Sequence, residues 1–472
     1  MWKLTGADQK KREYALMLLL IVGFALVYLS LCFNHNIWTD EAFTIDLLRN
    51  CDTYREAVQF TAGDVHPPLY YLILKPFTDV FGIRLFLLKA LSIIPMLLTM
   101  GLGITFVYRR YDFRTAFLYI LMMAVIPCSM EYAVQVRMYS WAMFFVTSCG
   151  FAAADAYDRG KRRDWIFLGL AGVAAAYTHY FAFVAVIWIY GFLFLALLWD
   201  AGKRKELLWW LAAVLLSLAA YAPWLRALQN QVTGVSKNYW IGAIDKEVLL
   251  SYFDTLFETK LPYSTQMMTF LFGAAFVWLA VEVIRKRKQE DVLGLLACLP
   301  LVMTAVTGVA VSLIMRPVFI ARYLMPCIPL FSFFFAVAWG RAEKKIYAAL
   351  LVFSFFLGVV DYEKNWYVEY ESTYVPQTEA FFAENLGEND LIVYNYKLFD
   401  FIYLCYFEPE QLCYIEDVDL SGDYDNIWLL DTHYNPDFSE EELEQYGWQK
   451  TFVGNYGIEH DEFKIYRISK SE

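Results

Sequence analysis

The sequence contains no internal repeat and no low-complexity segment, which excludes a repeat architecture. Its eight cysteines are scattered and lack the paired spacing of a metal site. Cys405 and Cys413 are candidates for a disulfide outside a membrane, with two separate thiols as the alternative. The first apolar segment, residues 14–32, follows three basic residues as a signal peptide does. No small-residue cleavage site accompanies it, so we expect it to be retained.

Polar residues are also scarce, because 59% of the 472 residues are hydrophobic and 19% are aromatic. A soluble protein is nearer half apolar. Many segments reach the roughly 20 apolar residues that cross a bilayer. The sequence therefore predicts a polytopic α-helical membrane protein with about 11 transmembrane helices. The expected spans are residues 14–33, 84–108, 114–130, 138–157, 164–178, 180–199, 206–225, 265–284, 292–315, 319–339 and 345–360.

The charge is distributed unevenly. Residues 361–472 hold 26 acidic and 6 basic side chains, a net charge of −20, whereas the preceding residues carry +9. We therefore expect two domains, a transmembrane domain over residues 1–360 and an acidic domain over residues 361–472. So acidic a domain argues against nucleic acid as a partner.

Lysine and arginine predict the topology. With eleven spans, all six basic clusters between the expected helices fall on the side of the N-terminus, which is therefore expected to be cytoplasmic. The acidic domain then lies outside the cytoplasm, and the protein is a multi-pass protein of the plasma membrane. The remaining polar loops collect on this outer side too, and their convergence is the main functional signal in the sequence.

The acidic domain has a different pattern. Short strands are predicted at residues 391–394, 411–415, 427–430, 449–453 and 463–468, and helices at 376–385, 398–406 and 439–446. Ser439 followed by Glu442 matches a helix N-cap. Alternating strands and helices predict a small extracytoplasmic α/β domain.

The first outer loop, residues 34–83, is expected to carry the active site. It contains the adjacent carboxylates Asp40 and Glu41, directly after the first span. A carboxylate within reach of an acceptor hydroxyl can act as a general base. The alternative is a helix N-terminus with Thr39 or Asp40 as its cap, and both interpretations can hold together.

Three other outer residues suit a phosphate. The Pro67-Pro68 pair restricts His66 to extended geometry, which aims its ring at a ligand unless the motif is only a stiff turn. Arg137 and Arg322 lie at the outer ends of spans, where arginines either snorkel to the interface or bind phosphate oxygens in a planar fork. We expect the two arginines to hold a lipid-linked phosphate and stabilise it as a leaving group, and we expect His66 either to donate to a phosphate or to bind a metal.

The weaker candidates for substrate binding are mostly aromatic, and the alternatives for them are an aromatic belt and a histidine satisfied by backbone. They are Tyr70, Tyr139, His179, Tyr180 and Tyr323. No cofactor is firmly predicted. A divalent metal held by Asp40, Glu41, His66 and His179 is one option, although their spacing is not diagnostic. Residues 229–266 are expected to form a mobile cover that includes Asn238, Tyr239 and Trp240.

These motifs occur in a recognisable order. The acidic pair is followed by His66-Pro67-Pro68-Leu69-Tyr70-Tyr71, Glu131…Arg137-Met138-Tyr139, Thr178-His179-Tyr180 and Arg322-Tyr323-Leu324-Met325-Pro326. The order resembles the GT-C glycosyltransferases of the protein O-mannosyltransferase and lipid A aminoarabinose transferase type, over about residues 1–345. The aminoarabinose branch has Lys-Pro-Pro where this chain has His66-Pro67-Pro68. The soluble repeat domain of eukaryotic mannosyltransferases has no counterpart here.

The resemblance implies an inverting transfer of a sugar from a polyprenyl-phosphate donor outside the cytoplasm. It implies Asp40 as the base beside Glu41, and His66, Arg137 and Arg322 as phosphate contacts. The acceptor is a glycan, a lipid or a protein. The alternatives are a transporter or flippase for a lipid-linked sugar, which predicts ionisable residues within spans and inverted repeats, and a binding role for the acidic domain.

Overall fold

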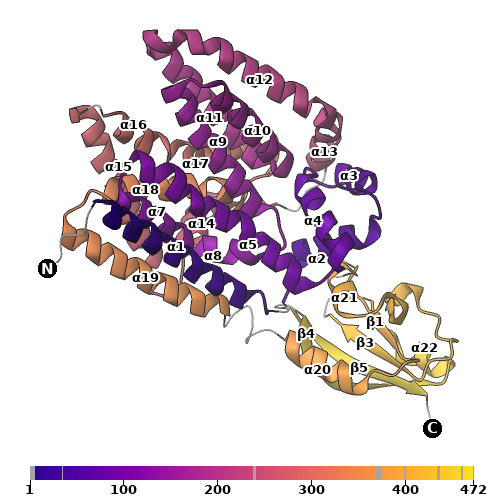
Figure 1. The fold of residues 1–472 in the computed structure, drawn as a ribbon. Helices are drawn as coiled ribbons and strands as arrows, with labels where there is room; N and C mark the ends of the chain where they lie inside the picture. Colours follow the sequence, from indigo (N-terminus) through magenta and orange to yellow (C-terminus); the bar gives the residue numbers. More distant parts are fainter. Residues whose placement is uncertain are drawn as a thin grey trace. The chain divides into compact units, whose positions relative to one another are not determined.

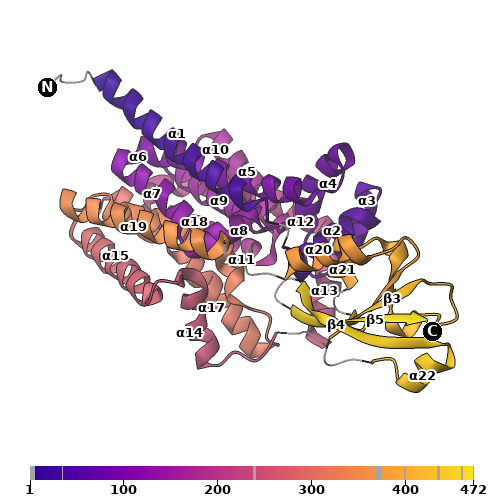
Figure 2. The same cartoon turned by 90° about the horizontal axis from the view of Figure 1, so that it is seen from below.

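The computed structural model describes residues 6–34, 36–237, 241–286, 288–366, 374–397, 400–432, 436–458 and 461–470 (Figures 1 and 2). Contacts between Cα atoms divide the chain into two compact units. The membrane unit comprises Met1–Cys32 and Thr53–Lys364, and the sheet unit comprises Phe33–Asp52 and Asn365–Glu472.

The membrane unit contains helices and no strand over its described residues. Its helices are α1 (Gly6–Leu31), α3 (Tyr54–Gly63), α4 (Leu69–Phe81), α5 (Leu85–Leu102), α6 (Tyr108–Arg110), α7 (Phe113–Val125), α8 (Pro127–Val134), α9 (Tyr139–Arg159), α10 (Arg162–Thr178), α11 (Tyr180–Trp199), α12 (Leu207–Tyr221), α13 (Leu225–Lys237), α14 (Lys246–Phe257), α15 (Ser264–Lys286), α16 (Gln289–Leu296), α17 (Leu299–Ile314), α18 (Ile328–Trp339) and α19 (Lys344–Trp366). Shorter turns occur at Gly103–Val107, Ala201–Glu206, Ala222–Trp224 and Ala321–Cys327.

Every expected span is largely helical, so the polytopic helical fold is confirmed, while the number of about 11 transmembrane helices stays a prediction. In the described part of the chain, eight helices are long and apolar enough to cross a membrane, or nine if the bent pair α7–α8 is one span. Two further expected spans are helical but are shorter or more polar than these eight. Helix α10 has 17 residues, and α9 begins with Tyr, Ser and Trp and carries Asp155 and Asp158 near its end. Both pack among other helices of the unit, where a less apolar surface is tolerated.

A sharp bend between consecutive helices occurs where a proline removes a backbone donor after α7. Pro127 begins α8, and the axis bends there by 66°. The expected mobile cover at residues 229–266 is also largely helical, since α13 and α14 occupy most of it. Asn238, Tyr239 and Trp240, which that expectation included, lie outside the described residues.

The sheet unit contains one mixed five-stranded sheet. Its strands are β1 (Leu391–Tyr394), β2 (Leu412–Tyr414), β3 (Asn426–Asp431), β4 (Trp448–Ile458) and β5 (Asp461–Lys470), in the order β2-β1-β3-β5-β4. Strands β2, β1 and β3 are parallel, and β5 and β4 add an antiparallel edge. The predicted strands and helices of the acidic domain are thereby confirmed.

Helices cover both faces of this sheet. On one face, Phe382 of α20 (Val375–Asn385) lies 6.2 Å from Trp428, and Tyr403 of α21 (Asp400–Tyr406) lies 5.1 Å from Tyr394, measured between ring centroids. On the other face, Leu443 of α22 (Glu440–Gln445) joins the core. The Ser439 side chain accepts the N–H of Glu442, which is the predicted cap, and Cys405 and Cys413 are separate thiols.

Helix α2 (Thr39–Asn50), which carries Asp40 and Glu41, belongs to the sheet unit. The ring of Phe43 meets that of Phe401 edge to face, with centroids 6.0 Å apart, and the Arg49 guanidinium donates to the Leu404 carbonyl. A short segment that follows the first span in sequence is therefore part of the core of a domain that begins more than 300 residues later.

Asp390 is a buried hub of the sheet unit. Its carboxylate accepts from Trp428 Nε1 at 2.8 Å, Asn426 Nδ2 at 3.0 Å and the Gly387 N–H at 3.0 Å. Asp390→Ala would leave the indole N–H buried without its acceptor, so we expect a loss of about 3 kcal/mol in the free energy of unfolding of this unit. Denaturant titration followed by tryptophan fluorescence measures it. Asp423→Ala, at an exposed carboxylate, is the control and should change stability by less than about 0.5 kcal/mol. Equal stability of the two variants would contradict the assignment.

Candidate active site

His179 is the centre of the polar cluster in the membrane unit. It lies between α10 and α11 and is the N-cap of α11, and its Nδ1 accepts the backbone N–H of Phe181 at 3.1 Å. The alternative interpretation, a histidine whose hydrogen bonds are made to backbone, therefore holds for Nδ1. Because Nδ1 accepts, a neutral ring carries its proton on Nε2, which is left as a donor.

Aromatic rings surround His179. Ring centroids lie at 5.2 Å for Tyr323, 5.6 Å for Tyr139 and 5.9 Å for His66, the last stacked nearly parallel. The cluster thus joins residues far apart in sequence, each from a junction between helices. His66 comes from the Pro-Pro turn that begins α4, and it is buried.

Two guanidinium groups act on both histidines. Burial, together with the charges of Arg137 and Arg322, lowers the pKa of His179 to about 3. Burial first, then Arg137, His179 and Arg322, lowers the pKa of His66 well below its usual value. Arginine stays protonated in proteins, so the histidines rather than the arginines lose charge. At neutral pH the cluster consists of two cations beside two neutral imidazoles.

The segments that carry the arginines are fixed by their neighbours. Arg137 is buried, and Ser92 of α5 donates to the carbonyl of Gln135 in the same segment at 2.6 Å. Before Arg322, the Phe319 carbonyl accepts the Tyr252 hydroxyl at 3.1 Å.

Gly308 contributes to the same anchoring. A Cβ at this position would lie 2.4 Å from the Phe319 ring, so only glycine allows α17 to approach the segment so closely. The positions of both arginines are therefore determined by packing elsewhere in the unit.

A cavity of about 360 Å³ opens beside this cluster. Its polar end contains His66, His179, Tyr180, Gln231, Arg316 and Tyr323. Its walls are hydrocarbon from α11 and α17, including Val184, Ile187, Val311 and Met315. A polar end attached to an apolar trough is the shape required by an amphiphile with a compact charged head.

A hydrogen-bonded chain closes one wall of the cavity. Trp224 Nε1 donates to the Tyr180 hydroxyl at 3.1 Å, and that hydroxyl donates to Gln231 Oε1. Gln231 Nε2 in turn donates to the Thr61 carbonyl at 2.8 Å, near the end of α3. The chain ties α13 to the turn that leads to His66, so Gln231 is a positioning residue.

The acidic pair lies on the sheet unit. Glu41 is buried, and its Oε2 accepts the Trp38 N–H at 3.2 Å, so Trp38 is the N-cap of α2. The expectation that Thr39 or Asp40 is the cap was wrong, because the reciprocal bond of Glu41 fixes the helix start one residue earlier. Asp40 is partly exposed, unlike Glu41.

The structure thus brings together His66, Arg137, Tyr139, His179, Arg322 and Tyr323, and it adds Tyr180 through the cavity wall. It packs Tyr70 against Tyr71, with centroids 5.4 Å apart and both side chains fully buried.

Sequence reasoning missed Gln231 and Arg316 as site residues. Arg316 follows an expected span on the outer side, so the rule that selected the other two arginines also applies to it. No sequence signal distinguishes Gln231 from other glutamines. Among the residues that the structure describes, no three His, Cys, Asp or Glu side chains group as metal ligands.

Comparison with known proteins gives two kinds of match. The family of dolichyl-phosphate-mannose-protein mannosyltransferases matches residues 65–226. The fold matches ArnT from Cupriavidus metallidurans, bound to undecaprenyl phosphate, at 11% identity and a TM-score of 0.60, covering 98% of both chains. The apo form of that protein gives 12% identity and 0.58, covering 96% of this chain and 97% of that one. No curated protein sequence matches the chain significantly.

The predicted resemblance is confirmed. Residues 65–226 match the mannosyltransferase family, and nearly the whole chain shares its fold with ArnT from Cupriavidus metallidurans. The matched segment includes His66, Arg137 and His179 of the polar cluster, whereas Arg322 and Tyr323 lie outside it.

The depressed pKa of His179 predicts a pH dependence of stability. Between its usual value of 6.5 and about 3, the unfolded chain binds a proton at this residue that the folded chain does not. The stability that the neutral ring contributes is therefore present above pH 6.5 and is lost as the pH falls through this window, by at most about 1.4 kcal/mol per pH unit.

We expect His179→Gln to reduce the pH dependence of stability by the contribution of one titrating proton. Thermal midpoints of the purified protein between pH 4 and pH 7 measure the slope. Phe181→Leu, which alters packing beside the same ring without removing a titrating group, is the matched control and should keep the wild-type slope. Identical slopes for His179→Gln and wild type would contradict the buried, neutral state.

Proposed function

We propose that the protein is an inverting glycosyltransferase that moves a sugar from a polyprenyl-phosphate donor to an acceptor hydroxyl at the outer face of the cytoplasmic membrane. The observation that carries this proposal is the position of His179, which lines the polar end of an apolar cavity and lies close enough to Arg137 and Arg322 for both charges to act on it. The match to the dolichyl-phosphate-mannose family and to a fold seen with undecaprenyl phosphate supports the same donor class.

The donor phosphate binds in the polar cluster. The guanidinium groups of Arg137 and Arg322 supply planar donors, His179 Nε2–H supplies one more, and the N-terminus of α11 adds the positive end of its dipole. His66, which faces the same ring, is the fourth contact. The isoprenoid chain follows the hydrocarbon walls between α11 and α17.

The acceptor attacks the anomeric carbon. Asp40 takes the proton of the acceptor hydroxyl while its oxygen bonds to that carbon and the bond from carbon to phosphate oxygen breaks. The electron pair remains on the departing phosphate. The two arginines stabilise the negative charge that grows there, so they bind the transition state more strongly than the ground state. Glu41 is occupied by the Trp38 N–H, which favours Asp40 as the base and Glu41 as its positioning neighbour.

The experiment that tests the activity is incubation of the purified full-length protein with a panel of polyprenyl-phosphate sugars. Consumption of one donor, with release of polyprenyl phosphate, is the expected result. A flippase would move the same lipid across a vesicle membrane without cleaving it. Translocation with every donor intact would therefore overturn the proposal.

Asp40→Asn should lower transfer by about 10²–10⁴-fold while donor binding is retained, because the amide cannot accept the hydroxyl proton. Single-turnover transfer and donor binding are measured on the same preparation. Asp52→Asn, at an exposed carboxylate also in the sheet unit, is the control and should transfer at the wild-type rate. Near-normal transfer by Asp40→Asn would remove this residue from the mechanism.

Arg137→Gln and Arg322→Gln should each weaken donor binding by roughly 10–100-fold, since each removes one charge-assisted contact to the phosphate. Titration with polyprenyl phosphate in detergent gives the Kd. Arg226→Gln on α13 is the matched control, because this arginine is exposed. If all three variants bind alike, the phosphate lies elsewhere.

A further inference from the structure

A second cavity, of about 390 Å³, lies at the other end of the helices that form the polar cluster. Helix α9 begins with Tyr139, beside His179, and reaches Asp158 near its end. At 1.5 Å per residue these two positions are about 28 Å apart along the helix, close to the thickness of a bilayer core of about 30 Å. The two cavities therefore lie about the thickness of one bilayer core apart along α9.

The walls of the second cavity are almost entirely apolar. Small residues on two helices leave the space, with Gly150, Ala153 and Ala154 from α9 and Ala196 from α11. Phe333 of α18 is among the larger residues that enclose it. A cavity of this size is in the range of natural ligand pockets, and its walls suit a hydrocarbon chain.

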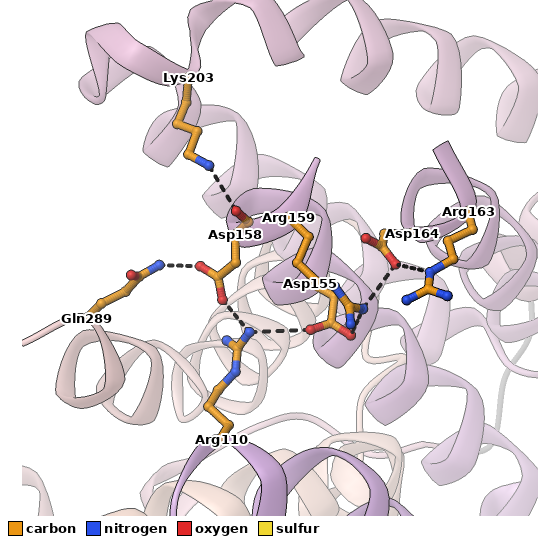
Figure 3. A network of polar contacts seen from close by, with 8 residues as sticks. All are labelled: Arg110, Asp155, Asp158, Arg159, Arg163, Asp164, Lys203 and Gln289. Carbon is orange, nitrogen blue, oxygen red and sulfur yellow. Dashed lines mark hydrogen bonds and ion pairs between the residues drawn. The ribbon is translucent and has the colours of Figure 1, made fainter. Parts of the chain in front are cut away.

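The mouth of this cavity is polar and zwitterionic. Arg110, Asp158 and Gln289 line it together with Tyr157. Figure 3 shows Arg110 between two carboxylates, with its Nη2 paired to Asp158 and lying 3.3 Å from Asp155. Gln289 donates to the second oxygen of Asp158.

Both ion pairs of Arg110 use the same nitrogen. Its Nε and Nη1 make no hydrogen bond to any residue that the structure describes, and its side chain is 18% exposed. The guanidinium also lies over the Phe106 ring, 4.8 Å from its centroid, which holds its plane in place. The guanidinium of Arg110, which lines the cavity, still has donors suited to a phosphate oxygen. The adjacent carboxylate of Asp158 is suited to an ammonium group.

We infer that this cavity binds one zwitterionic phospholipid with a primary amine, such as phosphatidylethanolamine. Its phosphate contacts Arg110, its ammonium contacts Asp158, and one acyl chain fills the apolar space. The assignment follows from charge complementarity, since the mouth offers one cation and one anion side by side. An anionic lipid would pair only with the cation, Arg110. A choline headgroup has no N–H to donate to the anion, Asp158.

The experiment uses the full-length protein, purified and delipidated in detergent, with phosphatidylethanolamine, phosphatidylglycerol or phosphatidylcholine added. Native mass spectrometry counts bound lipid, and thermal midpoints report stabilisation. We expect one phosphatidylethanolamine to bind about tenfold more tightly than either other lipid. Equal binding of all three, or a preference for phosphatidylglycerol, would overturn the inference.

Matched variants test the site itself. Ala196→Phe fills the cavity and should abolish the bound lipid, whereas Leu195→Phe, at an exposed neighbour on the same helix, should retain it. Arg110→Gln should weaken binding about tenfold, and Arg109→Gln, at the exposed neighbouring arginine, should not.

Asp158→Asn addresses the headgroup. It should remove the preference for phosphatidylethanolamine over phosphatidylglycerol. The ratio of the two affinities remains a valid measure even if the variant is less stable. Retention of that preference, or of the lipid in Ala196→Phe, would place the lipid elsewhere.

Discussion

The membrane unit depends on one electrostatic constraint, which is the burial of two guanidinium groups beside two imidazoles. Burial and the positive neighbours both disfavour protonated histidine, and arginine does not deprotonate. The result is a site whose cations are permanent and whose histidines are neutral donors. Such a site is preorganised for an anion, because its dipoles and charges need no rearrangement when negative charge develops.

The fold meets this constraint by taking its functional residues from breaks between helices. His66 follows α3, Arg137 lies between α8 and α9, His179 separates α10 from α11, and Arg322 lies in the short turn Ala321–Cys327. Irregular backbone within a membrane protein is tolerated only where it is buried in protein or lines a cavity. The same interruptions that expose backbone N–H groups therefore gather the polar side chains, and the long helices act as their supports.

Much of this arrangement could be predicted from the sequence, because it depends on local pattern. Apolar length identified the helical segments, and short runs rich in β-branched and aromatic residues identified the five strands of the sheet unit. The ordered motifs placed His66, Arg137, His179 and Arg322 on one side, which the structure brings to one cluster.

The features that sequence analysis did not predict depend on tertiary contacts. The packing of α2 on α21 and the role of Gln231 involve partners hundreds or tens of residues away. The N-cap of α2 is Trp38 rather than the expected Thr39 or Asp40. Tryptophan is a poor N-cap residue by type, so sequence propensity did not favour it. The number of transmembrane helices is hard to predict for a related reason, because helices that pack inside a bundle, as α9 and α10 do, can be shorter and more polar than helices exposed to lipid.

Arginines have different roles near the two ends of α9. Comparing the two ends shows why the position of an arginine in the sequence does not by itself predict its role. At one end Arg137 lies near the neutral rings of His66 and His179, where its charge acts on the groups that would meet a ligand. At the other end Arg110 and Arg159 share the carboxylate of Asp155, so much of their charge is balanced within the protein. A lysine and arginine count treats both sets as topology signals. The chemistry of each site is decided by the neighbours, with imidazoles around one set and carboxylates around the other.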